Sequence, residues 1–110
     1  MIEDTIQKIE ARIRGAGSVT DERRQELLQL VGTLKSEIAD LSKTHSEHAR
    51  SIAGFTQLST YEATREERNP QLLKLSLQGL AASVEGFEKS HSKLVQVVNS
   101  ISTTLSNLGI

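Results

Sequence analysis

The sequence predicts an all-α fold: a long antiparallel, coiled-coil-like helical hairpin with a short N-terminal helix, which completes a helical bundle by self-association. Apolar residues recur at alternating steps of three and four along residues 27–55 and 73–108, and this spacing is typical of helices packed side by side. Residues of high helix propensity make up much of the chain. A single proline, Pro70, separates the two periodic stretches.

Length and composition predict one helical domain over residues 1–110 and exclude several function classes. The 13 basic and 14 acidic residues give no global field that would attract nucleic acid or anionic lipid. One tyrosine and two phenylalanines are too few for a base-stacking platform. The chain has no cysteine, so disulfides and thiolate metal sites are excluded.

Neither a membrane span nor a secretory signal is expected. No apolar run reaches the roughly 20 residues that cross a bilayer, and the start Met1-Ile2-Glu3-Asp4 is acidic rather than basic and apolar. A cytoplasmic location is therefore the expectation.

The first predicted element is a helix over about 2–14. Ile2, Ile6, Ile9 and Ile13 recur at steps of four and three, which places them on one helix face. The sequence Gly-Ala-Gly at 15–17 then favours a turn, because glycine is costly inside a helix.

The second and third elements are two long helices over about 21–66 and 70–108. The first of them would be about 70 Å long at the usual rise of an α-helix. Asn69 suits a helix cap and Pro70 the first helical turn, so the helices should meet there as antiparallel neighbours. Ser90 is a second cap candidate, so the sequence allows a kink or a short break near Ser90-His91. The apolar positions predicted to form the interaction seam are Leu34, Ile38, Leu41, Ile52, Phe55, Leu80, Val84, Phe87, Leu94, Val98, Ile101 and Leu105.

Three histidines interrupt the two seams, and a fold at Asn69-Pro70 places His45 and His48 opposite His91. Three interpretations stay open for this layer. It can be a buried polar layer, with partners such as Thr44 or Ser92, that fixes the helix register. It can respond to pH, since histidine titrates near neutrality.

A metal site is the third interpretation of the histidine layer. Zinc accepts three histidines with one open position, and Glu47 or Glu88 would add a carboxylate. Glu88 and His91 also match the Glu-x-x-His spacing of di-metal helical bundles, although the spacing occurs once in the chain.

No residue pattern indicates catalysis. The strained serine elbow, the glycine-rich phosphate loop and the zinc-protease helix motif are all absent from the sequence. We therefore expect no enzyme and no cofactor, but a helical self-association, scaffold or protein-interaction module. Its partners would be a second copy in a homodimer or higher bundle, or another helical protein, without nucleic acid or a membrane span. The alternative is a metal-binding or pH-responsive bundle that uses a buried histidine layer.

The C-terminal quarter of the chain contains Phe87-Glu88, Ser90-His91, Leu94, Leu105 and the closing Leu108-Gly109-Ile110. Through these residues it resembles a bacterial family of small helical proteins known as domain of unknown function family 4404. The family usually has proline where this chain has Ser92. The resemblance implies a helical fold and no established activity.

Overall fold

The computed structural model describes residues 2–108, and this part of the chain is all-α with no strand. It forms a five-helix bundle with extents of 37 × 24 × 22 Å. The predicted all-α class and helical bundle are therefore confirmed. The helices are α1 (Ile2–Gly15), α2 (Asp21–Ser42), α3 (Ser46–Thr64), α4 (Pro70–Ser83) and α5 (Ser92–Leu108).

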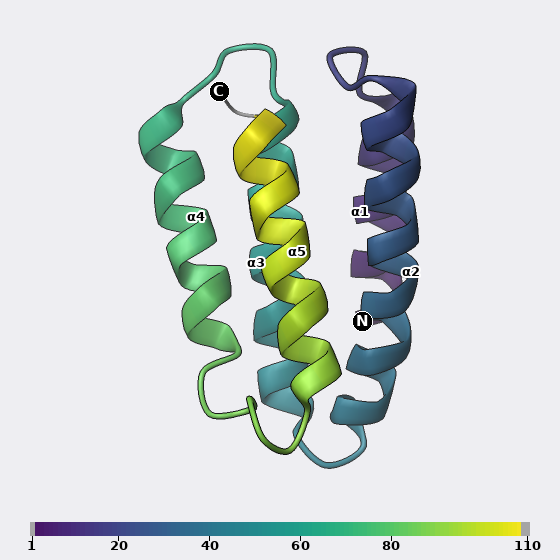
Figure 1. The fold of residues 1–110 in the computed structure, drawn as a ribbon, viewed down its shortest axis with the longest axis vertical. Helices are drawn as coiled ribbons and strands as arrows, with labels where there is room; N and C mark the ends of the chain where they lie inside the picture. Colours follow the sequence, from purple (N-terminus) through teal and green to yellow (C-terminus); the bar gives the residue numbers. More distant parts are fainter. Residues whose placement is uncertain (1, 109–110) are drawn as a thin grey trace.

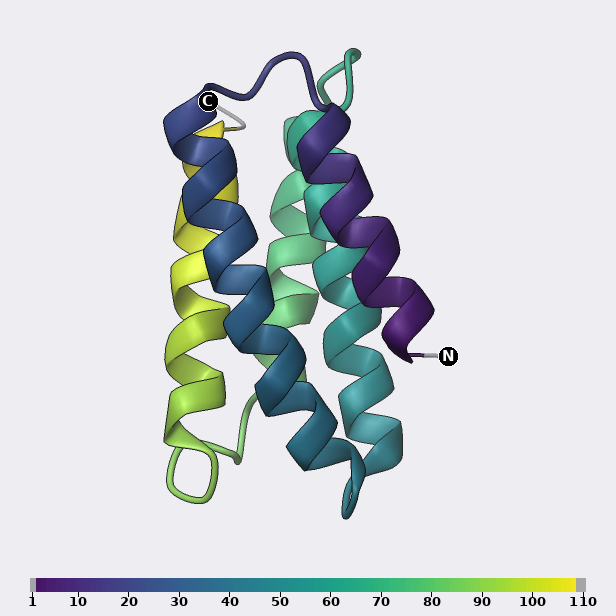
Figure 2. The same cartoon turned by 90° about the vertical axis from the view of Figure 1, so that its right-hand side faces the viewer.

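The five helices run alternately up and down, so that successive connections lie at opposite ends of the bundle (Figure 1). The α1–α2 and α3–α4 loops share one end, and the α2–α3 and α4–α5 connections share the other (Figure 2). Helix α3 packs against all four of the others. Its buried face is built mostly from Ala, Ser and Thr, and such small side chains let the neighbouring helices come close.

Helix α1 confirms the first predicted element. It buries Ile6, Ile9 and Ile13 and ends at Gly15. The next helix begins after Thr20, whose side chain accepts a hydrogen bond from the backbone N–H of Arg23 and so caps α2.

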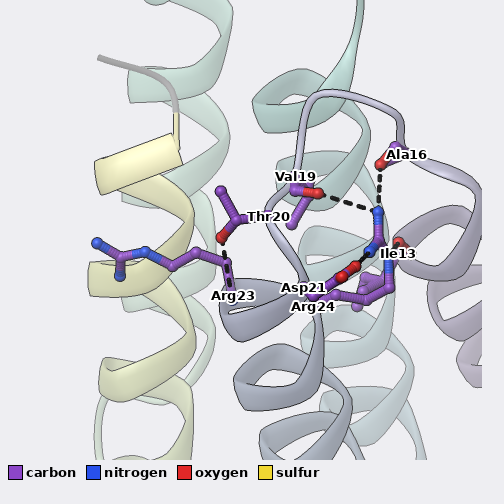
Figure 3. A network of polar contacts seen from close by, with 7 residues as sticks. All are labelled: Ile13, Ala16, Val19, Thr20, Asp21, Arg23 and Arg24. Carbon is purple, nitrogen blue, oxygen red and sulfur yellow. Dashed lines mark hydrogen bonds and ion pairs between the residues drawn. The ribbon is translucent and has the colours of Figure 1, made fainter.

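One arginine holds the α1–α2 connection. Arg24 on α2 donates hydrogen bonds to the carbonyl oxygens of Ile13 at 3.3 Å, Ala16 at 2.8 Å and Val19 at 3.0 Å (Figure 3). These carbonyls lie at the end of α1 and in the loop that follows it. The backbone hydrogen bonds that the Ile13 and Ala16 carbonyls accept, from the N–H groups of Ala16 and Val19, are long, at 3.4 Å, so the guanidinium supplies these oxygens with a further donor.

The predicted continuous helix over 21–66 is wrong. The chain turns back after Ser42, and α3 begins at Ser46. Hydroxyl groups end α2, since Ser42 donates to the carbonyl of Ala39 and Thr44 to that of Leu41. A helix of about 70 Å would bury one stripe only, whereas two shorter helices are each covered by several neighbours.

The predicted helix over 70–108 is broken, which is one of the two alternatives left open near Ser90-His91. Helix α4 ends at Ser83 and α5 begins at Ser92. Gly86 lies in the connection with a φ of 92°, a conformation that glycine adopts without strain. Its backbone N–H is bound by the Glu88 carboxylate, and the loop reverses the chain.

The turn predicted at Asn69-Pro70 is confirmed. The Asn69 side chain accepts a hydrogen bond from the backbone N–H of Leu72 at 3.1 Å, and Pro70 begins α4. This turn joins α3 to α4 as a short hairpin, however, and not the two long helices that the sequence predicts.

The predicted interaction seam is the core of a single chain. Eleven of its twelve residues are buried in one apolar cluster, so they are not available to a second molecule. Phe55 is the exception, with 37% of its surface exposed. The five helices enclose this core without a partner, and burial of the seam therefore gives no reason for self-association.

Candidate functional site

The three histidines converge at one end of the bundle, as predicted. His45 precedes α3, His48 is in its first turn, and His91 lies just before α5. The ring centroid of His45 is 6.1 Å from that of His48 and 6.2 Å from that of His91. Because the α2–α3 and α4–α5 connections share this end, the up-and-down topology brings the three rings together.

Phe87 is the centre of the cluster. Its ring centroid lies 5.5 Å from that of His45, 5.4 Å from that of His48 and 5.6 Å from that of His91. All three pairs are close to perpendicular, an arrangement in which the edge of one ring meets the face of the other. Phe87 itself is buried, so the imidazoles cover its outer side.

Neighbouring hydroxyl groups orient two of the imidazoles. Thr44 Oγ1 lies 2.7 Å from Nδ1 of His45, which confirms the predicted partner. Ser90 Oγ lies 2.9 Å from Nδ1 of His91. The hydrogen-bond partner of His91 is therefore Ser90 and not Ser92, the serine that was predicted. A hydroxyl can donate to a neutral ring nitrogen or accept from a protonated one, so both contacts persist in either state.

The prediction of a buried histidine layer is wrong. His45 and His48 are exposed and His91 is half-buried. The reason is the break between α2 and α3, which moves these residues from the middle of a long helix to the end of the bundle. The imidazoles are therefore partly hydrated and do not act as a buried polar layer inside the core.

The geometry does not favour a metal site. Within residues 2–108 no group of three or more His, Cys, Asp or Glu side chains is placed to hold a metal ion. The phenyl ring of Phe87 packs against all three candidate ligands. The Glu88 carboxylate, another candidate ligand, binds the N–H of Gly86 at distances of 2.9 and 3.1 Å. In the Glu-x-x-His stretch, Glu88 therefore stabilises the α4–α5 connection.

Helices α3 and α4 have an exposed apolar face that was not predicted from the sequence. Every large apolar side chain that is exposed in the described part of the chain belongs to one of these two helices: Phe55, Leu58, Tyr61, Leu72 and Leu75. Spacing alone does not reveal the face, because Leu58, Leu72 and Leu75 lie beside the seam and not in it.

A cleft at the other end of the bundle was also missed. It has a volume of about 660 Å³ and lies between the α1–α2 and α3–α4 loops. Arg12, Arg65 and Arg68 line it. Arg12 is far from Arg65 and Arg68 in the sequence, so only the fold brings it to them.

Comparisons of the chain with protein-family models, curated proteins and solved structures found no match. The resemblance to the family of unknown function 4404 therefore stays a prediction, and its closing Gly109-Ile110 lies outside the described residues. No helix between residues 2 and 108 combines the length and apolar character needed to cross a membrane.

Proposed function

We propose that this protein is a non-enzymatic helical module that self-associates through the outer face of α3 and α4. The observation that supports the proposal is the confinement of all exposed large apolar side chains of residues 2–108 to these two helices. Apolar patches of a few hundred Å² on a protein surface often mark an interaction site. The proposed location of this association is the cytoplasm.

Four of the exposed apolar side chains belong to one continuous face. Leu72, Leu75 and Gly79 recur at steps of three and four on α4, and Phe55 and Leu58 are three residues apart on α3. The Phe55 ring lies directly on Gly79, where it leaves no room for a Cβ atom. This contact joins the two helix surfaces.

The charge distribution supports a second copy of the chain as the occupant. Residues near the axis of a two-fold dimer meet their own copies, so a charge there would be repelled. Helix α4 has one charged residue, Lys74, which lines the groove shared with α5 instead. Helix α2, by contrast, carries eight charged residues.

The size of the face suits a weak dimer. The 14 residues of α4 span about 21 Å, and two adjacent helices are roughly 20 Å wide. The outline of the face is therefore about 400 Å², below the roughly 800 Å² that each partner gives to a standard interface. We expect a dimer that forms and dissociates with protein concentration.

Sedimentation equilibrium over a range of concentrations tests the proposal. Wild-type protein should approach twice the chain mass of 12.1 kDa, and Leu75→Glu should stay monomeric because the charge falls on the face. Ser100→Glu, which places the same charge on an exposed position of α5, is the matched control and should still dimerise. A wild-type monomer at about 1 mM, where an association free energy near −4 kcal/mol gives substantial dimer, would reject self-association and leave the face to another helical partner.

A pH-responsive end of the bundle is the second candidate function, favoured by the convergence of three imidazoles. Two charges about 6 Å apart repel by about 0.7 kcal/mol in water and by several times more in a less polar environment. His45 and His48 are exposed and His91 is half-buried, so water weakens this repulsion, and we expect a small loss of stability at acidic pH. The charged residues of segments 43–47 and 88–93 are of both signs: Lys43, Glu47, Glu88, Lys89 and Lys93.

The pH response is tested by urea unfolding at about pH 7.5 and about pH 5, on either side of the range in which histidine titrates. The wild type should lose more stability on acidification than His45→Gln, which removes the ring that contacts both others. Equal losses in the two proteins would show that the cluster is not pH-responsive.

A further inference from the structure

We infer that the cleft between the α1–α2 and α3–α4 loops binds a small oxyanion that carries a phosphate group. Its lining includes three arginines, Arg12, Arg65 and Arg68, and one acidic residue, Glu66. The volume of about 660 Å³ lies in the range of small-molecule sites. This inference does not depend on the proposed dimer.

Arg12 is held in place but lacks a counterion. Its Nε donates a hydrogen bond to Thr64 Oγ1 at 2.9 Å, and its guanidinium lies 4.8 Å from the ring centroid of Tyr61. The Thr64 hydroxyl donates in turn to the carbonyl of Thr60 at 2.7 Å, so it is oriented as an acceptor for Arg12. No carboxylate among residues 2–108 forms an ion pair with Arg12, and the two terminal nitrogens of the guanidinium are free to bind a ligand.

Arg65 is a second ordered cation at the cleft. It forms an ion pair with the buried Glu62 at 3.0 Å and lies 5.7 Å from the Tyr61 ring centroid. The pKa of Arg65 is raised chiefly by its hydrogen bond to Glu62, with further contributions from Glu62, Tyr61 and Glu67 as nearby acidic groups. Arg65 therefore keeps its charge, although Glu62 partly neutralises it.

Arg68 adds a third guanidinium, which forms no ion pair with a carboxylate among residues 2–108. Its Nη1 donates to the carbonyl of Leu108 at 2.8 Å, an acceptor without charge. Together with Arg12, it gives the cleft two cations that form no ion pair within the described residues. Guanidinium groups bind phosphate oxygens with two parallel hydrogen bonds, and two such groups favour an anion with several oxygens.

The glycine-rich turn also lines the cleft. Gly15, Gly17 and Ser18 line it, and no atom lies within 4 Å of where a Cβ of either glycine would be. The backbone N–H groups of Gly17 and Ser18 donate to no backbone carbonyl in the part of the chain that the structure describes. Such free amides are donors that phosphate groups use in other proteins.

Titration with inorganic phosphate, followed by NMR at constant ionic strength, tests the inference. The amide signals of residues 15–18 and the Nε–H signal of Arg12 should shift with a dissociation constant of about 1 mM, the order expected for one small anion. Arg12→Gln and Arg68→Gln should each weaken binding by at least roughly tenfold, the effect of one charge-assisted hydrogen bond. Arg23→Gln makes the same change of charge on α2 outside the cleft and should bind as the wild type does.

The outcomes of this experiment identify the source of the phosphate group or reject the site. Shifts with inorganic phosphate that Arg68→Gln weakens support a soluble ligand, and a dispersed spectrum of that variant shows that it is folded. If only vesicles containing phosphatidic acid bind, and Arg68→Gln abolishes this, the phosphate belongs to a lipid headgroup. Equal shifts with chloride, or equal affinity in Arg23→Gln and Arg68→Gln, would overturn the site.

Discussion

Replacement of Arg24 by glutamine should destabilise the bundle more than any other single change of a surface charge. The guanidinium binds the carbonyls of Ala16 and Val19 at 2.8 and 3.0 Å and reaches that of Ile13 at 3.3 Å (Figure 3). These bonds join the start of α2 to the end of α1. A glutamine side chain is shorter and has two N–H donors on a single nitrogen, where arginine has five on three nitrogens, so it cannot reproduce all three bonds.

The expected loss follows from the bonds that Arg24 makes. A hydrogen bond to a charged group contributes about 1.5–3 kcal/mol, and two of the three contacts are short. The side chain of Arg24 is 23% exposed, and the freed carbonyls regain contact with water, so we expect a net loss of about 2 kcal/mol. The ion pair with Asp21 adds little, because the Asp21 side chain is 95% exposed.

Urea unfolding of the variants measures this loss. Arg24→Gln should lower the free energy of unfolding by about 2 kcal/mol and the melting temperature by about 10 °C. Arg23→Gln is the matched control, since Arg23 points away from the loop carbonyls (Figure 3), and should change the stability by less than about 0.5 kcal/mol. Asp21→Asn should cost less than about 1 kcal/mol.

A loss below about 1 kcal/mol for Arg24→Gln would refute the reasoning, because it would show that water replaces the guanidinium at these carbonyls at little cost. Equal losses for Arg24→Gln and Arg23→Gln would refute it too, since general charge removal would then explain the effect. Hydrogen exchange should also become faster in α1 of the first variant alone.

Three further substitutions probe other contacts. Gly86→Ala should cost about 1–2 kcal/mol in urea unfolding, because Gly86 has a φ of 92°; an unchanged free energy would mean that the loop readjusts freely. Ser59→Ala should raise the stability in thermal melts by up to about 1 kcal/mol, since the buried hydroxyl of Ser59 has no hydrogen-bond partner within residues 2–108, and a clear loss would reveal a hidden partner. Thr104→Val should cost about 1–2 kcal/mol through loss of its 2.7 Å bond to Glu26, and a double-mutant cycle with Glu26→Gln should show coupling between the two positions.

The local signals in the sequence predicted α1 and the α3–α4 turn well. Ile6, Ile9 and Ile13 mark a single buried face. Asn69-Pro70 is a strong signal for the start of a helix, because Asn favours the N-cap position and Pro favours the first helical turn. In both cases the decisive residues are neighbours in the sequence, so no knowledge of tertiary structure is needed.

The turn between α2 and α3 could not be predicted from periodicity. The steps from Leu41 to His45, His48 and Ile52 continue the spacing of three and four across the break. The backbone of the turn stays close to helical at its start, with a hydrogen bond from the N–H of His45 to the carbonyl of Leu41 at 2.8 Å. Leu41 and Ile52, on the two sides of the turn, are both buried, and the spacing is unbroken although histidines stand at positions 45 and 48.

The convergence of the histidines was predicted from the wrong topology. A long hairpin and an up-and-down bundle both place positions 45 and 91 at the same height, so the prediction does not depend on which fold is present. Their exposure does depend on it, because the ends of helices lie at the surface of a bundle and the middle of a long hairpin does not. Distances between residues are in this case easier to predict than burial.

Charged residues are scarce on α4 and α5 compared with the other helices of the bundle. These two helices carry only Lys74 and Lys93 as charged residues, although α4 exposes Leu72 and Leu75 to solvent. A helix with a solvent-exposed face normally carries lysine and glutamate there, and depletion of charge is typical of the centre of an interface. These exposed leucines lie on α4 and not on α5. Because five helices already enclose the core, the proposed association through α3 and α4 is a physical reason for the lack of charge on α4.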